Sequence, residues 1–199
     1  MIMQYLVSFA LLVFVAGWIV GVYNRLEHLR RVVCNSWQQW RKITHRRNLC
    51  LRDFATEFAA FQPANNPMAQ NLLRLAVDSE RGVTLALEPR WNSQPGFIGG
   101  AELLLRQVVA DSVLAIETAY VISGHEQLLS LTHRVAALMG EQEQITALFN
   151  RAALEYNTAL VTPAARLLAP LLGFCTAAPL DAPGMQNTTP AASEGKLRV

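Results

Sequence analysis

The sequence predicts an all-α fold. An N-terminal single-pass transmembrane helix continues into the first helix of a long antiparallel four-helix bundle, and a disordered C-terminal tail follows. Three observations support this: residues Ile2–Tyr23 carry no charge and are almost wholly apolar, apolar residues then recur at helical spacing, and prolines and glycines cluster between those segments. We divide the chain into an anchor (residues 1–23), a helical bundle (residues 24–175) and a tail (residues 176–199).

The first segment is long enough to cross a membrane. An uncharged run of about 22 residues at 1.5 Å per residue spans about 33 Å, and a bilayer's hydrocarbon core is about 30 Å thick. A cleaved signal peptide would carry basic residues before the apolar run and a small-residue site after it, but the first basic residue is Arg25. Tyr5, Trp18 and Tyr23 lie near its ends, where amphipathic rings favour the headgroups. We therefore predict an uncleaved anchor.

The charges that follow predict the orientation of the anchor. Between residues 24 and 47 there are seven basic residues and one acidic residue, Glu27. Lys and Arg resist translocation, so a short N-terminus is expected outside and the bundle in the cytoplasm. Arg25, Arg30 and Arg31 are juxtamembrane and could attract anionic lipid. The alternative is that these charges only solvate a helix face.

Two glycines in the anchor indicate self-association. Gly17 and Gly21 form a G-x-x-x-G pattern, which lets two helix backbones approach closely in lipid. The expected partners are therefore the lipid bilayer and a second copy of the chain, with another membrane protein as a further possibility.

The first helix continues past the membrane to about Phe61. An apolar stripe follows it, with one gap around Arg47, and a stripe this wide requires partner helices. Pro63 and Pro67 end the helix, and Asn66 can cap the next one. The members of the stripe are Leu26, Leu29, Val33, Trp37, Trp40, Ile43, Leu51, Phe54, Phe58 and Phe61.

Two shorter helices are expected next. The second runs from about Pro67 to Glu88, and the third from about Gly100 to Val121. The expected inward stripes are Met68, Leu72, Leu75, Ser79, Val83 and Leu87 on the second, and Leu104, Val108, Val113, Ile116 and Tyr120 on the third.

The loop at residues 89–100, between the second and third helices, is rich in proline and glycine. Its apolar residues Trp91 and Phe97 are expected to fold back on the bundle or to meet lipid. This loop and the tail are the candidate contact sites for a partner.

The fourth helix is the most regular. It begins after Ser123, which can cap it together with Glu126, and it ends at Pro163. Nine of ten stripe positions are apolar, and Gln142 is the exception. A short apolar segment to Phe174 follows, and we expect disorder beyond it. The stripe comprises Leu128, Leu131, Val135, Leu138, Gln142, Ile145, Phe149, Ala152, Tyr156 and Leu160.

These blocks together resemble the LemA family of bacterial membrane proteins, from the anchor to about residue 174. The residues that carry the resemblance are Tyr23-Asn24-Arg25-Leu26, Trp37, Arg46-Arg47-Asn48-Leu49, Phe149-Asn150, Tyr156-Asn157, Pro163, Ala169 and Gly173-Phe174. The resemblance implies a bacterial inner-membrane protein with an outward N-terminus and a long helical bundle, and it implies no established enzymatic activity.

The sequence contains no catalytic, metal-binding or cofactor-binding signature. A di-iron bundle needs Glu-x-x-His, and no acid lies three residues before any of the four histidines: His28, His45, His125 and His133. H-E-x-x-H, G-x-S-x-G and Walker A patterns are absent. The three cysteines lack C-x-x-C spacing, and no aromatic-interleaved basic motif indicates nucleic-acid binding.

We therefore expect a membrane-anchored helical scaffold or organiser that self-associates and has no catalytic activity. The alternative is an adaptor or regulator subunit of another membrane complex, such as a protease or an envelope-stress system. The candidate partner contacts are Arg46, Arg47, Trp91 and Phe97. For Arg46 and Arg47, pairing inside the bundle is the alternative to a partner protein.

Overall fold

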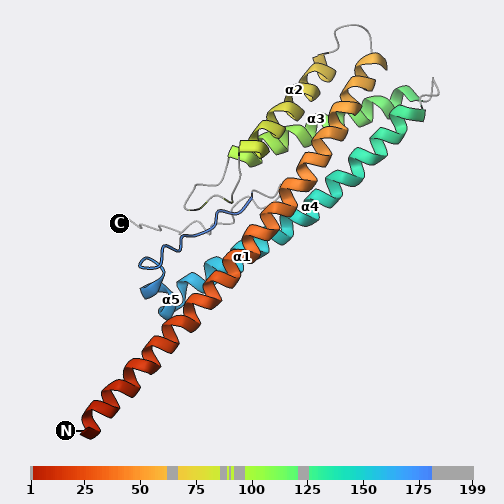
Figure 1. Cartoon of the computed structure of the whole chain (residues 1–199). Coiled ribbons are helices and arrows are strands. Elements are labelled where there is room, and N and C mark those ends of the chain that lie inside the picture. Colours follow the sequence, from red (N-terminus) through yellow and green to blue (C-terminus); the bar gives the residue numbers. More distant parts are fainter. Residues whose placement is uncertain are drawn as a thin grey trace, which may run out of the picture.

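The structure is a computed structural model, and it describes residues 2–61, 67–85, 89, 91, 97–120 and 126–180. The side chains of residues 2, 61, 97–101, 103 and 117–120 lie outside the description. The chain is all-helical in the described part, which contains no strand. The helices are α1 (Ile2–Phe61), α2 (Pro67–Leu85), α3 (Phe97–Tyr120), α4 (Glu126–Val161) and α5 (Pro163–Leu168) (Figure 1).

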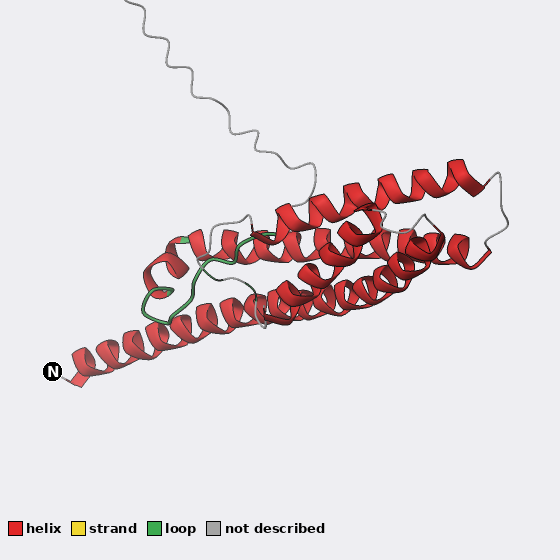
Figure 2. Ribbon diagram, turned by 90° about the horizontal axis from the view of Figure 1, so that it is seen from above, coloured by secondary structure: helices red, strands yellow, loops and turns green. Residues whose placement is uncertain are grey.

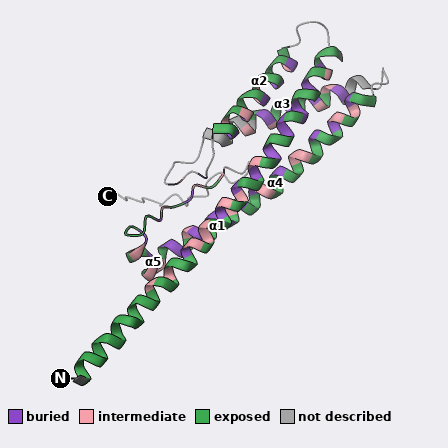
Figure 3. Cartoon of the chain, viewed as in Figure 1, coloured by how far each residue is buried: buried purple, intermediate pink, exposed green. Residues whose placement is uncertain are grey.

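Helix α1 is one uninterrupted element of 60 residues, with no break near Asn24. At 1.5 Å per residue it is about 90 Å long. Its most apolar window, of mean hydropathy 2.3, is 0% buried, and it is long and apolar enough to cross a membrane. The first core residue is Leu26, which is 1% exposed. One helix therefore carries an unburied apolar third and a second part that packs against the rest of the chain (Figure 3).

The second part of α1 packs against α4 and α2, and α2 packs against α3 (Figure 2). We call this part of α1 together with α2, α3 and α4 the helical body. Helices α1 and α4 are antiparallel: Trp37 meets Phe149 with ring centroids 5.5 Å apart, while Glu57, farther along α1, accepts a 3.0 Å hydrogen bond from Gln127, which is earlier on α4.

The helical body contains two hydrophobic cores. The proximal core lies toward the apolar end of α1 and includes Trp37, Trp40, Phe149 and Tyr156. Its two tryptophans stack with centroids 5.0 Å apart. The distal core includes Leu51, Phe54, Phe58, Leu72, Leu105, Val109, Leu128 and Val135. The apolar stripes predicted on α1, α2 and α4 supply nine of the fifteen buried residues described for the proximal core and six of the thirteen described for the distal core.

The predicted inward stripe of α3 is partly wrong. Leu104 is 56% exposed, whereas Leu105 and Val109 are buried. Leu103-Leu104-Leu105 and Val108-Val109 place two apolar stripes side by side, so apolar periodicity alone does not distinguish them. The line that faces the interior instead comprises Glu102, Leu105, Val109, Ser112 and Ile116, and Glu102 pairs with Arg47 of α1.

The chain reverses direction after α5. Gly173 has a φ of 72°, a left-handed conformation that favours glycine. Residues 174–180 then run back along α4 without regular helix, and Ala177 forms an isolated antiparallel bridge with Trp91. Residues 176–180 are thus held against the body, which moves the start of the predicted tail beyond residue 180. Residues 181–199 lie outside the described residues.

Candidate functional site

A cluster of buried polar side chains lies between the two hydrophobic cores. At its centre is Arg47 of α1, which is 0% exposed. Its guanidinium donates hydrogen bonds to Glu102 (2.9 Å from Nη2, with a second contact from Nη1), to Ser79 (3.0 Å) and to Gln142. The neighbouring Asn48 accepts two more, at 3.1 and 2.7 Å. Every guanidinium nitrogen of this arginine therefore has a partner.

Each helix of the body contributes to this central polar cluster. Helix α1 supplies Arg47 and Asn48, α2 supplies Ser79, α3 supplies Glu102, and α4 supplies Gln142. The partners also bond one another: Ser79 donates to Glu102 at 2.9 Å, Asn48 donates to Ser79 at 3.1 Å, and Gln142 donates to Glu102 at 3.2 Å. The cluster therefore joins all four helices at one level.

The charges within the cluster balance. Burial raises the pKa of Glu102, but the hydrogen bonds and positive charge of Arg47, together with hydrogen bonds from Ser79 and Gln142, outweigh that effect and hold the pKa below its ordinary value. Glu102 is therefore a carboxylate at neutral pH and is already committed to donors within the chain. This arrangement is suited to holding helices, not to transferring protons.

The cluster has a structural role of a recognised kind. A buried ion pair loses hydration and adds little net stability, but breaking one half of it is costly, so it favours one register of the helices over others. A one-turn shift of α1 or α3 would separate Arg47 from Glu102. A one-turn shift of α2 or α4 would withdraw Ser79 or Gln142 from the cluster. We therefore assign the cluster the function of fixing how the four helices align.

The lowered pKa of Glu102 predicts acid sensitivity. Its contribution to stability is complete above its ordinary pKa of 4.5 and is lost as the pH falls through the lower folded value. We expect the free energy of unfolding to decrease below about pH 4.5 and Glu102→Gln to flatten that decrease. Urea unfolding at a series of pH values measures this, with the exposed Glu141→Gln as control. Equal acid slopes in wild type and Glu102→Gln would contradict the assignment.

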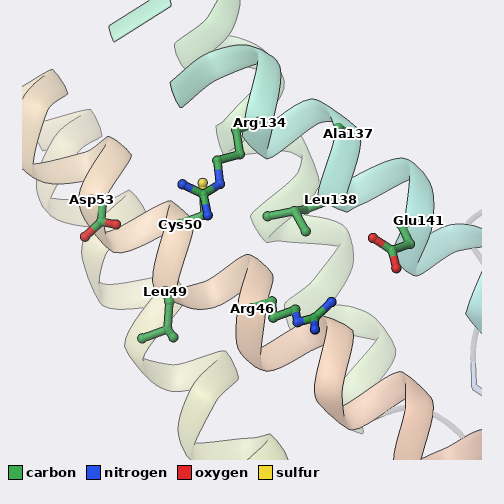
Figure 4. Close-up of a pocket in the computed structure, with 8 residues that line it drawn as sticks. All are labelled: Arg46, Leu49, Cys50, Asp53, Arg134, Ala137, Leu138 and Glu141. Carbon is green, nitrogen blue, oxygen red and sulfur yellow. The ribbon is translucent and has the colours of Figure 1, made fainter. Parts of the chain in front are cut away.

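A second feature is a groove of about 530 Å³ between α1 and α4. In Figure 4, Arg134 reaches toward Cys50, and Arg46 and Leu138 face the space between the two helices. Neither arginine makes an ion pair with any residue that the structure describes. The lining comprises Arg46, Leu49, Cys50, Asp53, Arg134, Ala137, Leu138 and Glu141.

Cys50 in this groove is not poised as a nucleophile. Burial raises the pKa of its thiol, more than the charge of Arg134 lowers it. The reactive form of cysteine is the thiolate, so a raised pKa disfavours reaction. Within the described part of the chain, no three His, Cys, Asp or Glu side chains gather as metal ligands would.

The glycines and basic residues predicted to act at the membrane lie on α1. Gly17 and Gly21 are exposed, and apart from the neighbouring backbone of α1 no described atom lies within 4 Å of where their Cβ atoms would be. Arg25 is also exposed. Arg31 pairs with Glu27 at 3.3 Å on the surface. Arg30 lies over the ring of Trp91, 5.2 Å from its centroid, so that side chain contacts the body.

The candidate partner contacts separate into different environments. Arg46 is exposed and lines the groove. Arg47 lies inside the body, where the bundle-internal pairing replaces the surface contact. Trp91 is half-buried against Tyr156, with centroids 5.8 Å apart. Phe97 begins α3, and its side chain lies outside the described residues.

Sequence reasoning did not identify Glu102 or Asn48 as partners of Arg47. A signal was nevertheless present in the sequence. Ser79 and Gln142 are polar residues on otherwise apolar stripes, and Arg47 lies at the gap in the stripe of α1.

Comparison of the chain with protein families, curated proteins and solved structures finds no match.

Proposed function

We propose that this chain is a membrane-anchored four-helix scaffold or organiser that self-associates and has no catalytic activity. The observation that carries the proposal is the continuity of α1, whose unburied apolar part leads without a break into the core of the helical body. A rigid connection of this kind holds a protein surface at a set distance and orientation from a bilayer. The resemblance to the LemA family supports the membrane anchor and the long helical bundle.

The proposed location is the inner membrane of a bacterial cell, with the N-terminus outside and the body in the cytoplasm. The excess of Lys and Arg after the apolar run supports this orientation. A C-terminal fusion to green fluorescent protein should fluoresce, and a C-terminal alkaline phosphatase fusion, which is active only outside the cytoplasm, should be inactive. The reverse result would overturn the orientation.

Self-association is proposed to run through Gly17 and Gly21. Both lie on a part of α1 that nothing else in the described chain covers, so a second α1 can approach closely there. We expect Gly17→Ile with Gly21→Ile to weaken dimerisation at least about tenfold, or about 1.4 kcal/mol. Förster transfer between labelled copies in liposomes measures this.

The control is Ala16→Ile, which also introduces a β-branched side chain but on a different face of the same helix. It should leave dimerisation unchanged. If the control and the double glycine variant weaken energy transfer equally, bulk in the lipid rather than the glycine face is responsible. If neither weakens it, the glycine interface is wrong.

The groove beside Arg46 and Arg134 favours a second candidate function, that of an adaptor for another membrane protein. Arg46 and Arg134 form no ion pair with any described residue. Beside an apolar floor they suit an acidic amphipathic segment, whose carboxylates would compete with Asp53 and Glu141 of the same groove. Under this alternative, Arg46→Glu with Arg134→Glu should remove a stoichiometric partner that co-purifies with the wild-type protein, and it should leave self-association intact. Purification of wild type without any other protein would favour the scaffold.

A further inference from the structure

The segment Phe174–Leu180, which we call the strap, is held along α4 at the end of the body nearest the apolar part of α1. Phe174 is 7% exposed and contacts Tyr23 of α1, with ring centroids 5.8 Å apart. Ala177 is 2% exposed. The strap is therefore packed against the helical body, with two of its side chains buried.

Two asparagines of α4 each form a pair of hydrogen bonds, called a grip below, with the main chain of the strap. Asn157 donates to the carbonyl of Ala177 at 2.8 Å and accepts from its N–H at 2.9 Å. Asn150 does the same for Leu180, at 2.8 Å in both directions. A side-chain amide paired in this way reproduces the donor and acceptor that a neighbouring β-strand would offer.

The spacing of the two grips suits an extended chain. Seven residues of helix rise about 10.5 Å, and three residues of extended chain cover about 10 Å. Asparagines seven apart on α4 therefore meet main-chain groups three apart on the strap. The match sets a register through main-chain groups alone.

The other polar contacts of the site also address the main chain. The hydroxyl of Tyr156 donates to the carbonyl of Cys175 at 2.9 Å, and Trp91 bridges to Ala177. Trp91 in turn packs on Tyr156 and lies beneath Arg30. The site thus selects an extended polypeptide with a small residue at the position of Ala177, where little space remains.

We propose that Asn150, Asn157, Tyr156 and Trp91 form a binding site for an extended polypeptide main chain, which the strap occupies in its own chain and which the strap of a second copy occupies in an exchanged dimer. The proposal deepens the proposed self-association and rests on it. Exchange of identical segments preserves every contact, so its cost is confined to the hinge. Gly173 precedes the strap and can change conformation readily, and a shared membrane would hold copies close together.

The first test uses the full chain with Ala177→Pro and Leu180→Pro, which removes both strap N–H donors and vacates the site. The probe is a fluorescent synthetic peptide of residues 173–180 with serine at position 175. We expect this variant to bind the peptide, and wild type, whose site is filled, to bind it at least about tenfold more weakly. N-methylation of the peptide at positions 177 and 180 should weaken binding about tenfold or more.

The matched controls separate main-chain recognition from misfolding. Adding Asn150→Asp and Asn157→Asp to the proline variant keeps the acceptors but sets a carboxylate oxygen against each strap carbonyl, so binding should be lost. Circular dichroism must show wild-type helix content. If the double proline variant loses helix, the single variant Leu180→Pro is used in its place. That variant frees only Asn150 from the strap. A folded, vacated variant that does not bind the peptide overturns the site.

The second test addresses the second copy and is independent of the glycine interface. Both chains carry Gly17→Ile and Gly21→Ile; one adds the two strap prolines and the other adds the two α4 aspartates. Only the combination of both chains has an intact site and an intact strap, so we expect that pair, and neither chain alone, to co-purify. Peptide binding without co-purification overturns the exchanged dimer. If the glycine variants form no dimers but still bind the peptide, the polypeptide-binding site stands and only the self-association fails.

Discussion

Replacing Arg47 with methionine is expected to lower the free energy of unfolding by about 3–5 kcal/mol, because it leaves Glu102 and Gln142 facing a buried space without their main donor. Urea unfolding followed by circular dichroism measures the loss. The adjacent Arg46→Met is the matched control. Arg46 is exposed, so its removal should change stability by no more than about 0.5 kcal/mol.

The same cluster makes a second, opposite prediction. Arg47→Met combined with Glu102→Leu removes both charges, and most of the stability lost in the single variant should return. The double variant should nevertheless lose the single defined alignment of the four helices, because the polar contacts that fix it are gone. If Arg47→Met alone is no more harmful than Arg46→Met, the four-helix polar cluster does not exist as described.

Phe149→Ala is expected to cost about 3–5 kcal/mol, since a large ring is removed from a core that cannot collapse around the gap. Phe149 is 0% exposed and lies against Trp37 in the proximal core. Its neighbour Leu148 is 56% exposed, so Leu148→Ala should cost no more than about 0.5 kcal/mol. Thermal unfolding of the two variants side by side measures the difference. Similar losses would mean that α4 is rotated from the orientation described here.

The helices could be predicted from the sequence because their stripes are long. On α1 and α4 the apolar positions repeat over many turns, and Pro63 and Pro163 mark where they end. The rotation of α3 could not be predicted, because Leu104 and Leu105 compete for the same inward position. The line that faces the interior includes the largely buried Glu102, and a carboxylate is not expected in a core.

The strap could not be predicted for a different reason. Composition marked residues 176–180 as disordered, and nothing local in that segment says otherwise. What holds it is a pair of asparagines far back on α4, Asn150 and Asn157. Both belong to the blocks that carry the family resemblance. Their role, however, depends on which segment of the chain packs beside them, and that is set by the tertiary structure.

The central proposal is that α1 passes from the bilayer into the helical body as one rigid helix. Double electron–electron resonance between spin labels at Val20→Cys and Gln38→Cys, in a chain in lipid nanodiscs whose native cysteines are replaced, tests it most directly. The account predicts a single narrow distribution near about 27 Å, from roughly 18 residues at 1.5 Å each. A broad distribution, or one centred well below that distance, would show a hinge near Asn24 and contradict the account.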